Sequence, residues 1–135
     1  MTKPSHILPR SVKLYLTLLI ISTGLILYGT LFPVDYDVPK QLLGLDKVIH
    51  ILMFGAWSFF YGLVRFLKQK FSLLPVFLVS SFFGLVIEVL QYVLPTGRSL
   101  ELMDFVADLT GIGLAVFVLY LLTKRVSEFR TEASS

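Results

Sequence analysis

Four long apolar runs constrain this chain more than any other feature of its sequence. Each approaches the ~20 residues that a helix needs to span the hydrocarbon core of a bilayer. The runs cover Leu14–Phe32, Val48–Leu67, Leu73–Leu94 and Leu102–Leu122. The apolar content of 56% exceeds the roughly 45–50% of ordinary soluble domains, so lipid is the expected solvent for most of the chain. We therefore predict an all-α membrane protein, a compact bundle of four transmembrane helices.

The length of 135 residues leaves room for one domain. We expect a transmembrane domain at 12–122, with tails at 1–11 and 123–135. The first run is followed by Phe32-Pro33-Val34 and not by the small-residue cleavage site of a signal peptide. We therefore expect the first helix to be a retained anchor.

Basic residues gather on one side of the predicted membrane. Nine of the 12 Lys and Arg residues flank the start of the first run, the second connection and the end of the fourth run. Short cytoplasmic loops carry such an excess, so we predict both termini in the cytoplasm and a multi-pass protein of a bacterial cytoplasmic membrane. Although the net charge is +3, the basic residues form short clusters and no single stripe. A nucleic-acid partner is therefore not expected; membrane lipids are.

Polar residues recur at the outer ends of the last three runs, in pairs one helical turn apart. The pairs are Asp46 with His50, Glu88 with Gln91, and Asp104 with Asp108. Charged residues within a membrane are costly and usually face the interior of a bundle. Asp108 also shares a helical face with Gly111 and Ala115, small residues that let transmembrane helices approach closely. We expect this stripe to face another helix, and Arg98 to be the cation for the surrounding acids.

Structural roles compete with functional ones at most of these positions. Asp46 and Ser99 suit helix N-caps, and Glu101 and Asp104 suit the positive end of a helix dipole. His50 alone is more typical of an interfacial histidine than of a ligand. Glu88 and Asp108 are predicted to lie inside their helices, where the structural alternative is an ion pair with Arg98 or Lys47. The aromatic residues are expected in packing and lipid contact: Trp57, Phe59, Phe60, Tyr61, Phe82 and Phe83.

The polar segments, in their order and spacing, resemble the VanZ-like family. The resemblance covers about residues 12–122 and is carried by Asp46-Lys47-Val48-Ile49-His50, Glu88-Val89-Leu90-Gln91, Pro95, Arg98 and Asp104-Phe105-Val106-Ala107-Asp108-Leu109-Thr110-Gly111. It implies a four-helix membrane protein of the bacterial cell envelope, in a family named for a member associated with resistance to the glycopeptide teicoplanin. Many members carry Asn at the position of Asp108, so a role for this carboxylate need not extend to the family.

Three functions fit the polar residues. The first is binding of a lipid-linked or peptidoglycan-related ligand at an outer-face site of Asp46, Lys47, His50, Glu88, Gln91, Arg98, Asp104 and Asp108. The second is a membrane-embedded hydrolase or transferase that acts on a lipid or lipid-linked substrate, with His50, Glu88 and Asp108 as candidate catalytic groups. The third is proton transport through buried carboxylates.

Cofactors and metals are not part of the main prediction. The chain has no cysteine, which excludes thiolate metal sites and cysteine nucleophiles. A divalent metal held by His50, Glu88, Asp104 and Asp108 is the weaker alternative, and it belongs to the hydrolase hypothesis. The sequence does not determine the oligomeric state.

Overall fold

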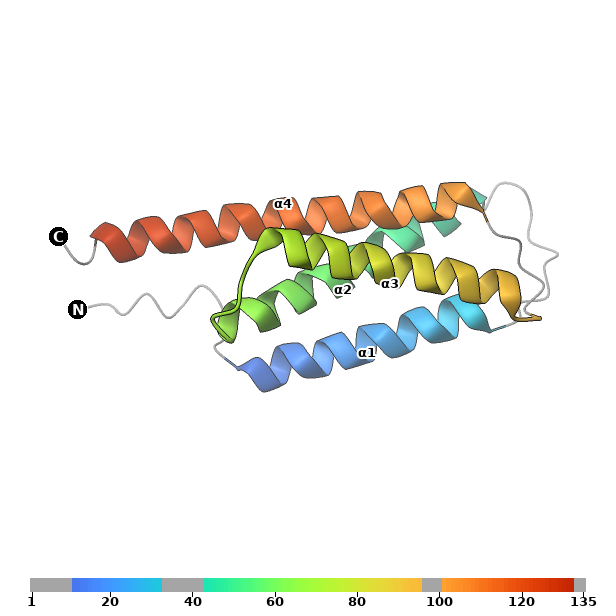
Figure 1. The fold of residues 1–135 in the computed structure, drawn as a ribbon, viewed down its shortest axis with the longest axis horizontal. Helices are drawn as coiled ribbons and strands as arrows, with labels where there is room; N and C mark the ends of the chain where they lie inside the picture. Colours follow the sequence, from blue (N-terminus) through green and yellow to red (C-terminus); the bar gives the residue numbers. More distant parts are fainter. Residues whose placement is uncertain (1–10, 33–42, 96–100, 133–135) are drawn as a thin grey trace.

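The protein is a bundle of four helices (Figure 1). The structure, a computed structural model, describes residues 11–32, 43–95 and 101–132. The helices are α1 (Val12–Leu31), α2 (Leu43–Leu67), α3 (Leu73–Val93) and α4 (Leu102–Glu132). All four are long and apolar enough to cross a membrane by length and composition. The predicted fold class, a four-helix bundle with four candidate membrane spans, is confirmed.

Two helix boundaries differ from those that the apolar runs predict. α2 begins at Leu43 and not at Val48, and α4 continues to Glu132, well past Leu122. Apolar composition marks the part of a helix that lipid can surround, whereas backbone hydrogen bonds continue through polar residues. The prediction of Asp46 as an N-cap is therefore wrong, because Asp46 lies within the first turn of α2. Ser99, the other predicted cap, lies outside the described residues.

The start of α1 and the end of α4 lie at one end of the bundle (Figure 1). The end of α1, the start of α2, the end of α3 and the start of α4 lie at the other end, which we call the polar end. Among the described helices, α2 and α4 share the most extensive contact, and α1 contacts α2 and α3 but not α4. The polar end therefore brings together the termini of all four helices.

Apolar side chains cover the outside of the bundle. Ile20, Leu74 and Phe82 are each about two-thirds exposed, and many other Leu, Val and Phe side chains are similarly uncovered. Polar side chains such as Ser58 and Ser80 are instead fully buried. This distribution is the one expected where the outer solvent is lipid.

Aromatic packing fills the middle of the bundle, next to the polar end. Phe54, Trp57 and residues from the other three helices form one buried cluster. The rings of Trp57 and Phe83 stack with centroids 4.5 Å apart, and Trp57 Nε1 donates a hydrogen bond to Thr23 Oγ1 at 2.8 Å. Trp57 is buried, which confirms packing for this aromatic residue, and Phe82 faces outward, the position expected of an aromatic residue in lipid contact.

Glycines bring α2 and α4 into backbone contact. A Cβ added at Gly111 would collide with the Ile51 carbonyl oxygen, and it would lie 3.0 Å from the backbone nitrogen of Gly55. Asp108, Gly111 and Ala115 are all buried, which confirms the prediction that this stripe faces another helix. The close approach also fixes the distance between the polar residues that the two helices carry.

The tight turn from α2 to α3 depends on a left-handed residue. Gln69 has a φ of 56°, and the backbone N–H groups of Gln69 and Lys70 donate to the carbonyls of Phe66 and Arg65, each at 3.0 Å. These two bonds form a Schellman motif, which satisfies carbonyls at the end of α2. Glycine is the usual residue at such a position.

Candidate functional site

An exposed salt-bridge network lies at the mouth of the polar end. Lys47 Nζ lies 2.7 Å from Asp104 Oδ1 and 3.3 Å from Glu101 Oε2. The Lys47 and Glu101 side chains are 33% and 50% exposed, whereas Asp104 is nearly buried. We call these three residues the rim. Because Lys47 lies on α2 and the two acids lie at the start of α4, the rim ties these two helices together at their ends.

A buried histidine–carboxylate pair lies one turn deeper than the rim. His50 Nδ1 lies 2.8 Å from Asp108 Oδ1, and the two side chains are 3% and 0% exposed. When the carboxylate is ionised, the Nδ1–H of His50 donates this hydrogen bond. A carboxylate in this position fixes both the tautomer and the orientation of the imidazole. Phe54, whose ring stacks 6.1 Å from that of His50, closes the site on the inner side.

Glu88 of α3 completes a buried group of three, which we call the triad. His50, Glu88 and Asp108 each offer one ligand atom, and these atoms all lie within 4.8 Å of one another. At about 1.5 Å per residue, the three residues lie roughly 7–11 Å inside the polar ends of their helices. The triad therefore combines three charge-bearing residues, from three helices, at one depth. The predicted convergence of these residues is thereby observed.

Gly84 makes the approach of α3 to this site possible. It lies one turn before Glu88, and a Cβ added to it would stand 3.4 Å from Asp108 Oδ2. Asp108 Oδ2 therefore faces the same surface of α3 that carries Glu88. It is buried and has no hydrogen-bond partner among the residues that the structure describes.

Gln91 links the site to the first helix. Its Nε2 donates to the backbone carbonyl of Thr30 at 3.0 Å, and both residues are 2% exposed. We predicted Gln91 as a ligand-binding residue and α1 as a simple anchor. The contact gives Gln91 a structural bond and gives α1 a place beside the site. Sequence reasoning missed Thr30, because its contribution is a backbone carbonyl that no side-chain pattern reveals.

Asp46, another of the predicted site residues, belongs to neither the triad nor the rim. Asp46 is half-buried and groups with His50 and Asp104, again with ligand atoms within 4.8 Å. In that second group, however, Asp104 is already engaged by the Lys47 ammonium. Arg98, the predicted cation, lies outside the described residues, so its pairing stays a prediction. Within the described part of the chain, Lys47 is a cation that contacts two acids at the start of α4.

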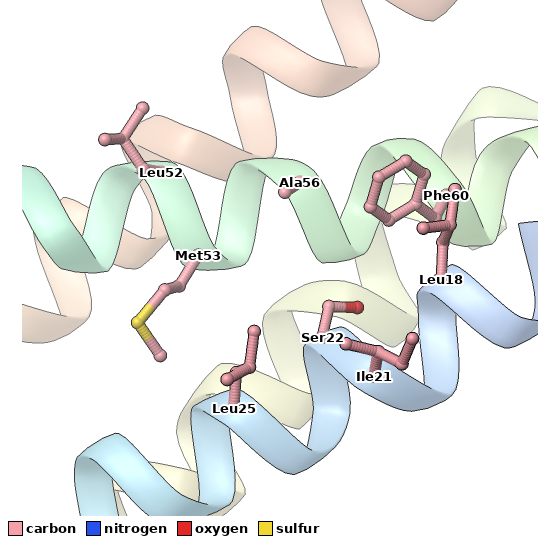
Figure 2. A pocket seen from close by; sticks show the side chains of 8 residues that line it. All are labelled: Leu18, Ile21, Ser22, Leu25, Leu52, Met53, Ala56 and Phe60. Carbon is pink, nitrogen blue, oxygen red and sulfur yellow. The ribbon is translucent and has the colours of Figure 1, made fainter.

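A separate groove opens between α1 and α2 and shares no residue with the triad or the rim. Figure 2 shows its lining, which comes from one face of each helix and encloses about 330 Å³. The lining residues are Leu18, Ile21, Ser22, Leu25, Leu52, Met53, Ala56 and Phe60. The Ser22 hydroxyl donates to the Leu19 carbonyl, so the surface of the groove is apolar.

Comparisons of this chain with models of protein families, with curated proteins and with solved structures find no match. The residues and geometry of the polar end are therefore the basis for any functional assignment.

Proposed function

We propose that this chain is a VanZ-like multi-pass protein of the bacterial cytoplasmic membrane that binds a lipid-linked or peptidoglycan-related ligand at its polar end. The observation that carries the proposal is the continuity of polar groups from the exposed rim to the buried triad. A ligand anchored in the membrane reaches such a site from the lipid. Ionisable groups within a membrane destabilise the protein, so they are usually retained for a function. This cluster is therefore the leading candidate for the functional site.

The chemistry of the rim supports a polar headgroup as ligand. Lys47 is held in place by Asp104 and Glu101 yet remains one-third exposed, so it can contact a phosphate without leaving its partners. Arg98, in the connection before α4, would add a bidentate donor for phosphate or carboxylate. The carboxylates of the rim can accept hydrogen bonds from sugar hydroxyls or amines.

Binding of a polyprenyl phosphate tests this proposal. The detergent-purified full chain is titrated with the lipid and the bound fraction is read by native mass spectrometry, with phosphatidylglycerol as the comparison lipid. We expect Arg98→Ala to weaken binding roughly 10-fold, equivalent to about 1.4 kcal/mol. Lys124→Ala is the matched control, because Lys124 is exposed on α4 toward the opposite end of the bundle. Unchanged affinity in Arg98→Ala would refute the proposal.

Orientation is part of the proposal, with both termini in the cytoplasm and the polar end outside. Because the chain has no native cysteine, single cysteines give a clean test. Ser11→Cys, just before α1, and Pro95→Cys, just after α3, lie at opposite ends of the bundle and are exposed. A membrane-impermeant maleimide applied to intact cells should label Pro95→Cys and spare Ser11→Cys. The reverse pattern would place the polar end in the cytoplasm.

The hydrolase or transferase alternative is favoured by one specific observation. Asp108 orients His50 through Nδ1, which is how a general base is positioned in histidine–carboxylate catalysis. In this alternative His50 accepts a proton from water or a lipid hydroxyl. Hydrolysis of a polyprenyl pyrophosphate to polyprenyl phosphate and inorganic phosphate by the wild type, but not by His50→Gln, would establish it.

The family resemblance also extends the proposal to teicoplanin resistance. This resistance is measured as a change in minimal inhibitory concentration when the chain is expressed in a susceptible host.

A further inference from the structure

We infer that the triad of His50, Glu88 and Asp108 is a binding site for a divalent first-row transition-metal ion of the Zn²⁺ class. The inference goes beyond the proposed ligand binding and does not depend on it. It also narrows the four-residue metal set considered from the sequence, because it leaves Asp104 out.

The types of donor select the class of metal. One imidazole nitrogen and two carboxylate oxygens form a mixed N/O set, which Zn²⁺ and Mn²⁺ accept. Ca²⁺ and Mg²⁺ prefer oxygen alone, and the absence of cysteine removes the thiolates that softer ions prefer. Three protein ligands leave a coordination position open, as in catalytic rather than structural zinc sites.

The spacing of the donors is close to what an ion requires. Ligand atoms about 2.0–2.1 Å from a Zn²⁺ ion are roughly 3.3 Å apart in a tetrahedral site. The His50 Nδ1 to Asp108 Oδ1 distance is 2.8 Å, and all three ligand atoms lie within 4.8 Å of one another. Side-chain rotations alone can close a difference on the order of 1 Å. An ion at this point replaces the proton between His50 and Asp108, since a metal ligand must be deprotonated.

An independent observation at Asp108 favours a cation at the triad. Its Oδ2 is fully buried, faces the α3 surface that carries Glu88, and has no hydrogen-bond partner among the described residues. Leaving a buried carboxylate oxygen without a donor or a cation is expensive. A metal ion between α3 and α4 supplies the positive charge at this oxygen.

The second group, Asp46 with His50 and Asp104, does not fit a metal as well. Lys47 Nζ lies 2.7 Å from Asp104 Oδ1, so an ammonium already neutralises that carboxylate. A divalent ion there would meet electrostatic repulsion from Lys47. It would also take His50 away from Asp108. The Lys47 ammonium of the rim therefore disfavours a metal ion next to Asp104, and the triad is the better metal site.

Metal binding by the detergent-purified full chain tests the inference. The protein is stripped with a chelator, dialysed, and titrated with Zn²⁺ against a chromophoric competitor. We expect one Zn²⁺ per chain, with proton release on binding. Co²⁺ is added as a second probe, because its visible absorption reports nitrogen and oxygen ligands directly in the wild-type protein. Fewer than one site per chain for every ion tested, or a Co²⁺ spectrum of the fully hydrated ion, would overturn the inference.

Ligand variants locate the site. His50→Gln, Glu88→Gln and Asp108→Asn preserve approximate volume while removing one donor each. We expect each to weaken Zn²⁺ binding by more than about 100-fold, beyond the roughly 10–100-fold loss typical of outer-shell changes. Glu128→Gln is the matched control, since Glu128 is an exposed acid of α4 far from the polar end, and this variant should retain wild-type affinity. Wild-type affinity in the three triad variants, or equal losses in all four, would also refute the triad as the site.

Helical content and elution volume from a sizing column show which variants remain folded. If a variant does not fold, the Co²⁺ spectrum of the wild-type protein still tests the inference. The result is separable from the proposed function. Loss of lipid binding in Arg98→Ala with an intact zinc site supports both conclusions. Zinc binding with no polyprenyl phosphate binding keeps the metal inference and removes the ligand proposal.

Discussion

Replacing Gly111 by alanine should push α2 and α4 apart. The added Cβ would collide with the Ile51 carbonyl oxygen and would lie 2.9 Å from the Ile51 carbonyl carbon and 3.0 Å from the Gly55 nitrogen. All of these atoms belong to the backbone, so no side chain can rotate away. Because favourable contacts lie at about 3.5–4.0 Å, the helices must separate by at least roughly 0.5 Å, which sacrifices a quarter or more of the dispersion attraction at the contact.

Gly113→Ala is the matched control for this prediction. It lies on the same helix, and nothing stands within 4 Å of its added Cβ. Both variants gain the roughly 0.5–1 kcal/mol by which alanine favours a helix over glycine, so this gain cancels in the comparison. Overpacking costs about 1–3 kcal/mol, and contact with rigid backbone places the cost toward the upper end. We expect Gly111→Ala to have a free energy of unfolding about 2–3 kcal/mol below that of Gly113→Ala.

Reversible unfolding in mixed detergent micelles measures the difference. Trp57 is the single tryptophan of the chain and is buried, so its fluorescence reports the transition. Equal stability of the two variants, within about 0.5 kcal/mol, would show that the α2–α4 contact is not as close as described. Gly111→Ala should also weaken Zn²⁺ binding while Gly113→Ala does not, because α2 carries His50 and α4 carries Asp108.

Reversible unfolding also checks three smaller effects, and the loss of helical circular dichroism reports it for Trp57→Phe, which lacks the single tryptophan. Trp57→Phe removes the donor to Thr23 Oγ1 and should lower the free energy of unfolding by about 1 kcal/mol, as expected for an interhelical hydrogen bond in a membrane protein. This loss should largely disappear in a Thr23→Val background. An equal loss in that background would contradict the hydrogen bond. Gly62→Ala meets the flexible end of the Leu119 side chain, so we expect a cost below that of Gly111→Ala, and a larger cost would refute this reasoning. Gln69→Gly relieves the left-handed conformation at φ 56° and should stabilise by up to about 1 kcal/mol, whereas destabilisation would show that the turn does not need glycine-like freedom.

The apolar runs were sufficient to predict the number and type of elements. A bilayer imposes one length and one secondary structure on a spanning segment, because backbone groups in lipid must bond within the helix. Boundaries were less certain where polar residues continue a helix, as at Leu43 and Glu132. Local composition determines contact with lipid, but it does not determine where backbone hydrogen bonding stops.

The candidate residues of the polar end were also visible in the sequence. A carboxylate such as Glu88 or Asp108 inside an apolar run is costly in lipid, so its presence alone points to the bundle interior. The one-turn spacing of Asp104 and Asp108 placed both on the face that the small residues share. Both carboxylates are buried, as that reasoning predicts.

Partner choice was decided only by the tertiary structure. The sequence places several cations and acids at the polar end. Local sequence does not determine that Lys47 pairs with Asp104 and His50 with Asp108. The offset between α2 and α4 makes that assignment, and Gly55 and Gly111 set the offset through backbone contact. Helix periodicity reveals which side chains share a face, whereas the axial register between helices depends on packing between residues far apart in the sequence. The sequence thus determined four apolar helices with buried acids, and the packing of those helices determined which acid meets which base.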